Sequence, residues 1–319
     1  MKISILGSGA YGMAIASVLH YNKHSIKMWT NSNEEANYLN ANRRSPKVNY
    51  DIPSDIIIST NMKDVVSDSD VIIFATPSEF AGSVSREVSN YYNSQYIGIA
   101  SKGIDNKSLL CLSDVIKMNI NTDLIAVISG CTFASDMVRE SLLGLNVASK
   151  NLDTLNVISS ILENDYLSVY KTNDVIGTEI CGAVKNIMAI GSGIISGMGY
   201  PESSSAMFMT LATKEIAHLI KCLGGDVNTI FSFAGIGDLI LTCSSKESRN
   251  FTLGNMIGKK IDTKDYIKNT TIEGLYTLKA IVDIAKKNNI NMPITMMINS
   301  VINDDKSSYD FINLICKLK

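Results

Sequence analysis

The chain has 319 residues, of which 45% are hydrophobic, and its 29 basic and 31 acidic residues leave a net charge of −2. The length is sufficient for two domains, and the apolar fraction is ordinary for a globular protein. Because the charge is balanced, composition gives no electrostatic reason to expect nucleic acid or an anionic membrane surface as a partner.

Six cysteines are scattered through the sequence without a CxxC pair. This pattern favours reduced thiols in a cytoplasmic protein over a disulfide framework, and no metal site is expected. The apolar residues that follow Met1 do not indicate a signal peptide, because a glycine motif interrupts them.

This glycine motif, GSGAYG at positions 7–12, lies between a β-type run, Lys2–Leu6, and a helix-type segment that ends near Asn22. A second β-type run at 26–29 completes a unit of about thirty residues, the size of a dinucleotide-binding βαβ unit. In such a motif Gly7 makes the tight turn, Gly9 lets backbone approach the pyrophosphate, and Gly12 lets helix pack on strand. The N–H groups at the helix start then bind the pyrophosphate. The motif therefore predicts a bound dinucleotide.

The end of the second strand should indicate which nicotinamide cofactor is bound. An acidic residue there would take the ribose 2′-OH of NAD, and an arginine would favour the 2′-phosphate of NADP. The strand is followed instead by Thr30 and Asn31, and charged residues come only later, at Glu34, Glu35, Arg43 and Arg44. Neither rule is met, so the choice between NAD and NADP stays open.

Strand-like runs separated by helix-length segments continue at 55–59, 71–76, 96–101, 124–129, 146–149 and 167–170. This alternation predicts a Rossmann-like domain with a mostly parallel sheet. Ligands in such sheets bind outside the carboxyl ends of the strands, where segments 76–78, 101–103 and 129–134 fall. Lys102, between a buried strand and a glycine, could be an ordinary surface lysine, but this position favours a ligand role.

After about residue 172 the pattern becomes helical. One apolar stripe contains Met209, Ala212, Ile216, Leu219 and Leu223, with Glu215 among the polar residues outside it, and a second stripe spans 275–285. We therefore expect a dinucleotide-binding domain over 1–178 and an all-helical substrate domain over 179–319.

The stretch 179–199 is apolar and rich in small residues, and Lys185 carries its only charge between 183 and 200. Its length and glycine content predict a buried core helix and not a membrane span. Ala189, Gly193 and Gly197 follow the lysine at four-residue steps, so the helix face beside it is almost bare, and either a second helix or a substrate packs there. Burial would lower the pKa of Lys185 towards the range useful for proton transfer. The alternative is an ammonium group that reaches solvent.

Farther along, Asp238 is either a turn residue or a partner that opposes the pKa drop of Lys185, so the resting protonation of the lysine stays open. Ser248 suits a helix N-cap. Arg249 and the first free N–H groups of that helix would then form an anion site matched to a phosphate. The alternative is an exposed arginine at a helix start.

Taken together, these residues resemble the bacterial-type NAD(P)-dependent glycerol-3-phosphate dehydrogenases over nearly the full length. The matching segments are, in chain order, the glycine motif, Thr76-Pro77-Ser78, Lys102-Gly103, Ser129-Gly130, Phe133-Ala134, Cys181-Gly182-Ala183-Val184-Lys185-Asn186, Gly235-Ile236-Gly237-Asp238-Leu239, Thr242-Cys243, Ser248-Arg249-Asn250, Glu273-Gly274 and Met292-Pro293-Ile294.

The resemblance implies an oxidoreductase that interconverts sn-glycerol 3-phosphate and dihydroxyacetone phosphate with NAD or NADP, with Lys185 as the acid–base. Implied substrate contacts are Lys102, Gly130, Thr132, Asp238, Ser248, Arg249 and Asn250. Implied cofactor contacts are Gly7, Gly9, Ala10, Tyr11, Gly12, Lys102, Ala134, Arg249, Thr271 and Glu273. A homodimer would be ordinary for such an enzyme, although the sequence does not set the oligomeric state.

The sequence also departs from the family pattern. Cys131-Thr132 replaces the usual Pro-Ser, Asn31 replaces an arginine, and Ser203 and Leu211 replace an asparagine and an arginine. One alternative is a related hydroxyacid dehydrogenase, because a nucleotide domain followed by a helical domain with an internal lysine suits several substrates. Arg249 would then pair with a carboxylate. The other is a dinucleotide-binding protein without catalysis, which only Ser203 and Leu211 suggest.

Overall fold

The computed structural model describes residues 1–304 and 306–318, which form two compact units. The first unit comprises Met1–Lys102 and Leu112–Val175, and the second comprises Gly103–Cys111 and Ile176–Lys319. A nine-residue segment between the two parts of the first unit thus belongs to the second.

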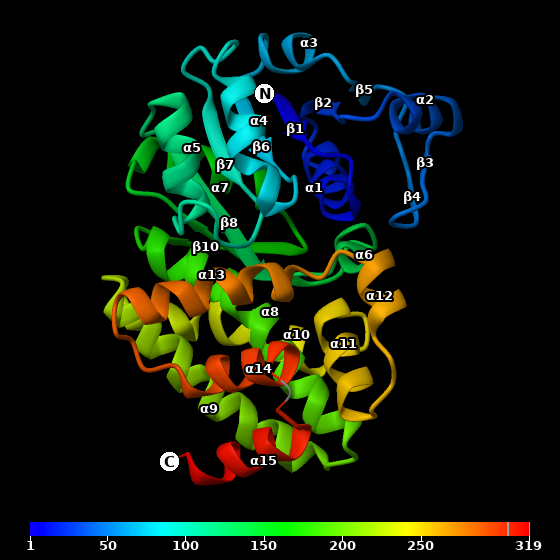
Figure 1. The fold of residues 1–319 in the computed structure, drawn as a ribbon. Helices are drawn as coiled ribbons and strands as arrows, with labels where there is room; N and C mark the ends of the chain where they lie inside the picture. The colour runs from blue at the N-terminus through cyan, green and yellow to red at the C-terminus, as the bar shows by residue number, and fades with distance from the viewer. Residues whose placement is uncertain (305, 319) are drawn as a thin grey trace. The chain divides into compact units, whose positions relative to one another are not determined.

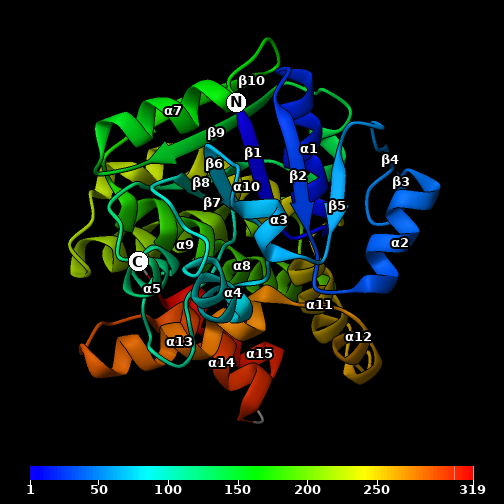
Figure 2. The ribbon, with the colours of Figure 1, turned by 90° about the horizontal axis from the view of Figure 1, so that it is seen from above.

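An eight-stranded sheet forms the centre of the first unit (Figure 1, Figure 2). Its strands run in the order β10 (Leu167–Thr172), β9 (Leu143–Ala148), β8 (Ile125–Cys131), β7 (Tyr96–Ile99), β6 (Val71–Phe74), β1 (Lys2–Leu6), β2 (Ser25–Trp29) and β5 (Ile57–Ser59). Strands β8 and β9 are antiparallel, and the other neighbouring pairs are parallel. The prediction of a Rossmann-like, mostly parallel sheet is confirmed.

Helices cover both faces of this sheet. Helices α1 (Ala10–Tyr21) and α7 (Leu152–Leu162) pack on the face that contains Ile3 and Ile5. Helices α3 (Met62–Val66), α4 (Ala81–Val88) and α5 (Leu112–Ile120) pack on the face that contains Ile72 and Phe74. Because both faces are covered, a central strand such as β6 is apolar at every position and buried throughout.

Two features of the first unit were not predicted. The β8–β9 connection contains only the short helix α6 (Ala134–Met137), too little chain for a parallel crossover, so the strands pair antiparallel. Helix α2 (Asn33–Asn42) leads into a hairpin of β3 (Arg44–Ser45) and β4 (Tyr50–Asp51). Strands of two residues are too short to show an alternating pattern in the sequence.

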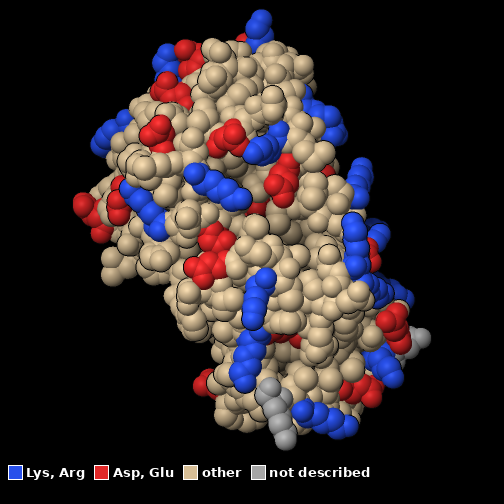
Figure 3. Space-filling model, turned by 90° about the vertical axis from the view of Figure 1, so that its left-hand side faces the viewer, with Lys and Arg blue, Asp and Glu red and all other residues tan. Residues whose placement is uncertain are grey.

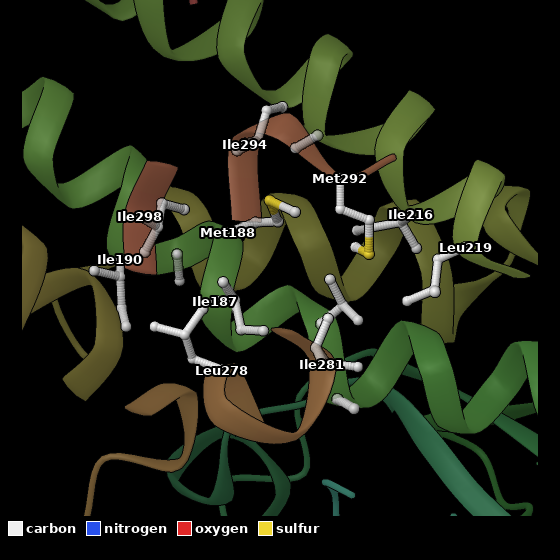
Figure 4. Packing of buried hydrophobic residues seen from close by; sticks show 14 of the residues in the cluster. Ile187, Met188, Ile190, Ile216, Leu219, Leu278, Ile281, Met292, Ile294 and Ile298 are labelled. Atoms are coloured by element: carbon white, nitrogen blue, oxygen red, sulfur yellow. The ribbon is translucent and has the colours of Figure 1, made fainter. Parts of the chain in front are cut away.

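The second unit is helical, as predicted. Its helices are α8 (Val175–Gly197), α9 (Glu202–Cys222), α10 (Asp238–Ser244), α11 (Arg249–Gly258), α12 (Lys264–Asn269), α13 (Glu273–Lys287), α14 (Pro293–Asn303) and α15 (Ser308–Lys317). Figure 4 shows the centre of its core, where Ile187 and Ile190 of α8 lie among side chains of α13 and α14.

Helix α8 is the core element of this unit. It is long and apolar enough by composition to cross a membrane, but 89% of its most apolar window is buried inside the protein. Every residue from 177 to 195 is buried, including Lys185. The prediction of a buried core helix is confirmed, although the helix begins at Val175 and not at Glu179.

The bare face of α8 packs directly against α11. A Cβ atom on Gly193 would lie 2.1 Å from the carbonyl oxygen of Phe251, and one on Gly197 would lie 2.2 Å from that of Asn255. The contact is reciprocal, because Gly254 and Gly258 of α11 would clash in the same way with backbone carbonyl groups of α8. Of the two predicted alternatives, the second helix is the one observed here.

Glu215 differs from the expectation that it lies outside the buried face of α9. Its side chain is buried and accepts hydrogen bonds from the N–H groups of Ile294 and Thr295, each at 2.8 Å, and from the Thr295 hydroxyl at 2.7 Å. These N–H groups begin α14 and have no partner within the helix, so a buried carboxylate satisfies them.

Surface charge follows the balanced composition. On the face drawn in Figure 3, basic and acidic side chains lie interspersed.

Candidate active site

The glycine loop after β1 has the backbone geometry that the motif predicts. Gly7 has a φ of +121°, and a Cβ on Gly12 would lie 2.1 Å from the carbonyl oxygen of Gly7. A Cβ on Gly9, in contrast, would meet no described atom within 4 Å. Open space at the middle glycine is what the approach of a pyrophosphate requires.

The start of α1 can also accept an anion. Among the described residues no side chain caps its N-terminus, and its first turn contains no acidic residue. Its first N–H groups and the positive end of the helix dipole are therefore available to a phosphate. Ala10 and Tyr11, predicted to contact the cofactor, form the first turn of this helix. The loop thus fits a dinucleotide.

Four predicted ligand residues come together beside this loop, within the first unit. Lys102 donates a hydrogen bond to the carbonyl oxygen of Gly130 at 3.3 Å, and its Nζ lies 5.8 Å from the centre of the Tyr11 ring. The Tyr11 hydroxyl lies 3.0 Å from Oγ1 of Thr132. They meet because β7 and β8 are neighbouring parallel strands that end at the same edge of the sheet. Ala134 follows at the start of α6.

In the second unit, Lys185 and Asp238 form a buried ion pair. The lysine Nζ lies 2.6 Å from Oδ1 of Asp238, and the two side chains are 10% and 1% exposed. A sharp turn positions the aspartate, because Gly235 has a non-helical ψ of −109° and a Cβ there would lie 2.2 Å from the carbonyl oxygen of Ile230. The alternative of a lysine that reaches solvent is therefore wrong for this structure.

A third side chain completes this arrangement. Thr242 Oγ1 lies 3.0 Å from the Lys185 Nζ and 3.3 Å from Oδ1 of Asp238. No role was predicted for Thr242, although its i+4 spacing from Asp238 places both side chains on one face of α10. The neighbouring Cys243 is buried, and burial raises the pKa of its thiol, so it stays protonated and unreactive at neutral pH.

Helices α8 and α11 run side by side in a regular register. Gly254 packs on Ile190 and Gly258 packs on Ile194, and four residues earlier the Asn250 amide donates to Oδ1 of Asn186 at 3.0 Å. Each advance of four residues along α11 is matched by an advance of four residues along α8 in the same direction. The two helices therefore run parallel. The same register places the start of α11, at Arg249, level with Lys185.

The start of α11 has the predicted cap. Ser248 accepts a hydrogen bond from the N–H of Phe251 at 3.2 Å, which confirms it as the N-cap. The Arg249 side chain is exposed. Asn250 points inward, where its amide oxygen accepts from the Gly274 N–H at 2.9 Å. An exposed guanidinium beside a capped helix start can bind an anion.

The remaining predicted cofactor residues lie at the start of α13. Glu273 is in its first turn and accepts a hydrogen bond from the Asn186 amide at 3.2 Å. Thr271, two residues earlier, is exposed. A chain of polar contacts therefore joins α8, α11 and α13. Two of the departures from the family pattern are on α9, where Ser203 is exposed and Leu211 packs against the core.

A glycine loop that fits a dinucleotide is combined here with a helical unit in which a buried lysine–carboxylate pair lies level with a helix start that could accept an anion. These are the features of a dinucleotide-dependent dehydrogenase. The chain belongs to the NAD-dependent glycerol-3-phosphate dehydrogenase family. Residues 2–155 match the family's N-terminal model, and residues 174–313 match its C-terminal model. The resemblance inferred from the sequence is confirmed.

Curated relatives and solved structures agree with this assignment. Glycerol-3-phosphate dehydrogenase (NAD(P)+) of Staphylococcus haemolyticus is 34% identical over 97% of this chain and 96% of the relative. The enzyme of the same name from Fusobacterium nucleatum is 32% identical over 98% and 96%. The crystal structure of glycerol-3-phosphate dehydrogenase from Coxiella burnetii superposes with a TM-score of 0.94 at 27% identity, covering 99% of each chain.

Proposed function

We propose that this protein catalyses the NAD(P)-dependent interconversion of sn-glycerol 3-phosphate and dihydroxyacetone phosphate. The observation that carries the proposal is the parallel register of α8 and α11, which places a buried lysine level with an exposed arginine at a helix start. One group suits proton transfer and the other suits a phosphate. A phosphorylated alcohol needs both.

In the proposed division of labour, residues 1–178 hold the cofactor and residues 179–319 carry the substrate chemistry. The glycine loop and α1 bind the pyrophosphate, with Ala134, Arg249, Thr271 and Glu273 as further contacts. When bound, the nicotinamide accepts the C2 hydride of the alcohol or returns it to the ketone. The protein supplies orientation and electrostatic stabilisation.

Lys185 is the proposed acid–base. In the reducing direction its ammonium group donates a proton to the carbonyl oxygen at C2, and in the oxidising direction its neutral amine takes that proton back from the hydroxyl. Asp238 and Thr242 lie within hydrogen-bond reach of the same Nζ and hold it in place. The Asp238 carboxylate also favours the charged form that donates the proton.

The substrate phosphate is held by Arg249 and the N–H groups at the start of α11. Ser248 supports this site by capping the helix, and Asn250 supports it through Asn186. Lys102, Gly130 and Thr132 are the proposed substrate contacts from the first unit. In this proposal the protein works in the cytoplasm as a homodimer, an oligomeric state that light scattering on the purified protein would test.

The test is the loss of NADH and NADPH absorbance when dihydroxyacetone phosphate is added to purified protein. We expect oxidation of at least one cofactor, and a Lys185→Met variant should lose at least about a hundredfold in kcat. Because this substitution removes the ammonium group that balances the buried Asp238 carboxylate, Lys185→Met/Asp238→Asn serves as a second variant that should fold but remain inactive. Near-normal turnover by either folded variant would disprove the acid–base role. Oxidation with a 2-oxo acid and not with the phosphate ester would favour a hydroxyacid dehydrogenase.

A further inference from the structure

A carboxylate lies at the end of β2, although the sequence has none at that position. Glu35 is in the first turn of α2, and its Oε2 accepts a hydrogen bond from Oγ1 of Thr30 at 3.1 Å. Thr30 is the first residue after β2. The acidic residue that the sequence lacks at the strand end is therefore supplied from five residues farther on.

This carboxylate is fixed and accessible. Lys47 donates to its Oε1 at 2.5 Å, and the Glu35 side chain is 24% exposed. Each carboxylate oxygen can accept more than one hydrogen bond, so both retain acceptor capacity after pairing with Thr30 and Lys47. A ribose hydroxyl can therefore bind without displacing either partner.

The carboxylate also belongs to the same edge of the sheet as the glycine loop. Strands β1 and β2 are neighbouring parallel strands, and the Gly7 N–H donates to the carbonyl oxygen of Trp29 at 2.9 Å, one residue before Thr30. In dinucleotide-binding units an acidic group at this strand end takes the adenosine ribose 2′-OH. We propose that Glu35 takes this role and makes the protein prefer NADH to NADPH. The inference rests on the cofactor site of the proposed function.

The two arginines that follow β2 in the sequence are engaged elsewhere. Arg43 follows the C-terminus of α2, about 15 Å along the helix from its start. Its guanidinium donates to the carbonyl oxygen of Ile56 at 2.7 Å, and that of Arg44 contacts Asn49 and Asp51 in the hairpin. The cation at the strand end is Lys47, and its charge is matched by Glu35. A 2′-phosphate, with up to two negative charges, would therefore meet a carboxylate whose positive partner is already paired.

Glu35 could instead serve only the fold, since it stands three residues after the N-cap Ser32, as in a capping box. The Ser32 side chain does accept from the Glu35 N–H at 3.1 Å. The Glu35 carboxylate, however, accepts hydrogen bonds from Thr30 and Lys47 and not from the backbone N–H of Ser32. That N–H lies 3.5 Å from the Thr30 hydroxyl oxygen instead. A purely structural role predicts a loss of stability with no change in cofactor selectivity.

The experiment measures the Kd values of NADH and NADPH by calorimetry for the wild type, Glu35→Gln and the control Glu34→Gln. Glu34 is an exposed neighbour in the same helical turn, so this control removes the same charge without removing the proposed ligand. We expect the wild type to bind NADH more tightly. Glu35→Gln should weaken NADH and strengthen NADPH, so that the ratio of the two Kd values shifts by about tenfold or more. Glu34→Gln should leave the ratio unchanged.

A second variant tests the part played by Lys47. Glu35→Gln frees this lysine to meet a 2′-phosphate, so adding Lys47→Met should remove most of the NADPH gain. Tighter wild-type binding of NADPH, or an unchanged ratio in a Glu35→Gln protein that binds both cofactors, would overturn the inference and leave the proposed reaction standing. Failure of the wild type to bind either cofactor would overturn both.

Discussion

The Lys185 ammonium and the Asp238 carboxylate lie 2.6 Å apart, in a place where the aspartate side chain is 1% exposed. Removing one partner of a buried ion pair leaves the other charge without compensation, which costs about 3–5 kcal/mol. The pair therefore links the proposed chemistry to the stability of the second unit.

Asp238→Asn should lower the free energy of unfolding by about 3 kcal/mol and reduce kcat. Urea unfolding measures the first effect and steady-state turnover the second. In Lys185→Met/Asp238→Asn both charges of the pair are removed, so much of the lost stability should return while activity stays absent. If adding Lys185→Met to Asp238→Asn lowers the free energy of unfolding by as much as Lys185→Met does alone, the two side chains do not act as a pair.

Thr242→Val removes one hydrogen-bond partner of the Lys185 Nζ at nearly constant volume. Because the lost contact is to the proton-transfer group, we expect kcat to fall by about tenfold while KM changes little. Thr210→Val, at an exposed position of α9, is the matched control and should not change kcat. A rise in KM at constant kcat would place Thr242 in substrate binding and not in positioning the lysine.

Two glycine substitutions should affect different properties, one the stability of the fold and the other the binding of the cofactor. Gly193→Ala places a methyl group 2.1 Å from the carbonyl oxygen of Phe251, so the helices must separate, and we expect a loss of about 3 kcal/mol in the free energy of unfolding.

Gly9→Ala is the counterpart, because its methyl group meets no described atom within 4 Å. It should leave the denaturation midpoint almost unchanged and weaken cofactor binding at least tenfold, since the methyl occupies the space that a pyrophosphate would approach. Thermal unfolding and NADH calorimetry on both variants distinguish the effects. Equal cofactor affinity in Gly9→Ala and the wild type would contradict the assignment of this loop.

Glu215 should make stability depend on pH. Burial raises its pKa, and the hydrogen bonds from Ile294 and Thr295 offset this rise only in part. The folded state therefore holds the proton more tightly than the unfolded chain does. The stabilisation that protonated Glu215 gives to the folded state is fully present below its unfolded-state pKa of about 4.3. It is lost as pH rises through the pKa of Glu215 in the folded state.

Urea unfolding of the wild type and Glu215→Gln between pH 4 and 7 tests this sign. The stability of the wild type relative to the variant should be greatest near pH 4 and decline towards neutral pH. A difference that grows with pH would mean that the hydrogen bonds to the start of α14 outweigh the cost of burying the carboxylate.

Features encoded locally were predictable from the sequence. The βαβ unit follows from glycine spacing between two apolar runs, and α8 follows from the length and composition of one segment. The N-cap at Ser248 could be predicted from its hydroxyl side chain and from the helical sequence that follows it. In each case the determining residues lie within a few turns of one another.

The features that escaped prediction depend on distant contacts. Glu215 looked like a surface residue because its partners at the start of α14 lie about eighty residues away. Glu35 was not recognised as the acidic residue of β2 because that residue is expected directly after the strand in sequence. In the folded chain the Glu35 carboxylate reaches Thr30 from the first turn of the next helix. The antiparallel β9 depends on how little chain connects it to β8.

The glycine contact between α8 and α11 also bears on which molecules fit. The spacing of these helices is set by backbone against backbone, so no side chain there can shorten or lengthen to adjust it. If Lys185 meets the reacting oxygen and the start of α11 meets the phosphate, this spacing fixes the number of carbon atoms between the two groups. A phosphate ester one carbon longer would have to slide one helix along the other. The glycines would thus limit the length of the substrate, although each of them is itself packed against backbone of the facing helix.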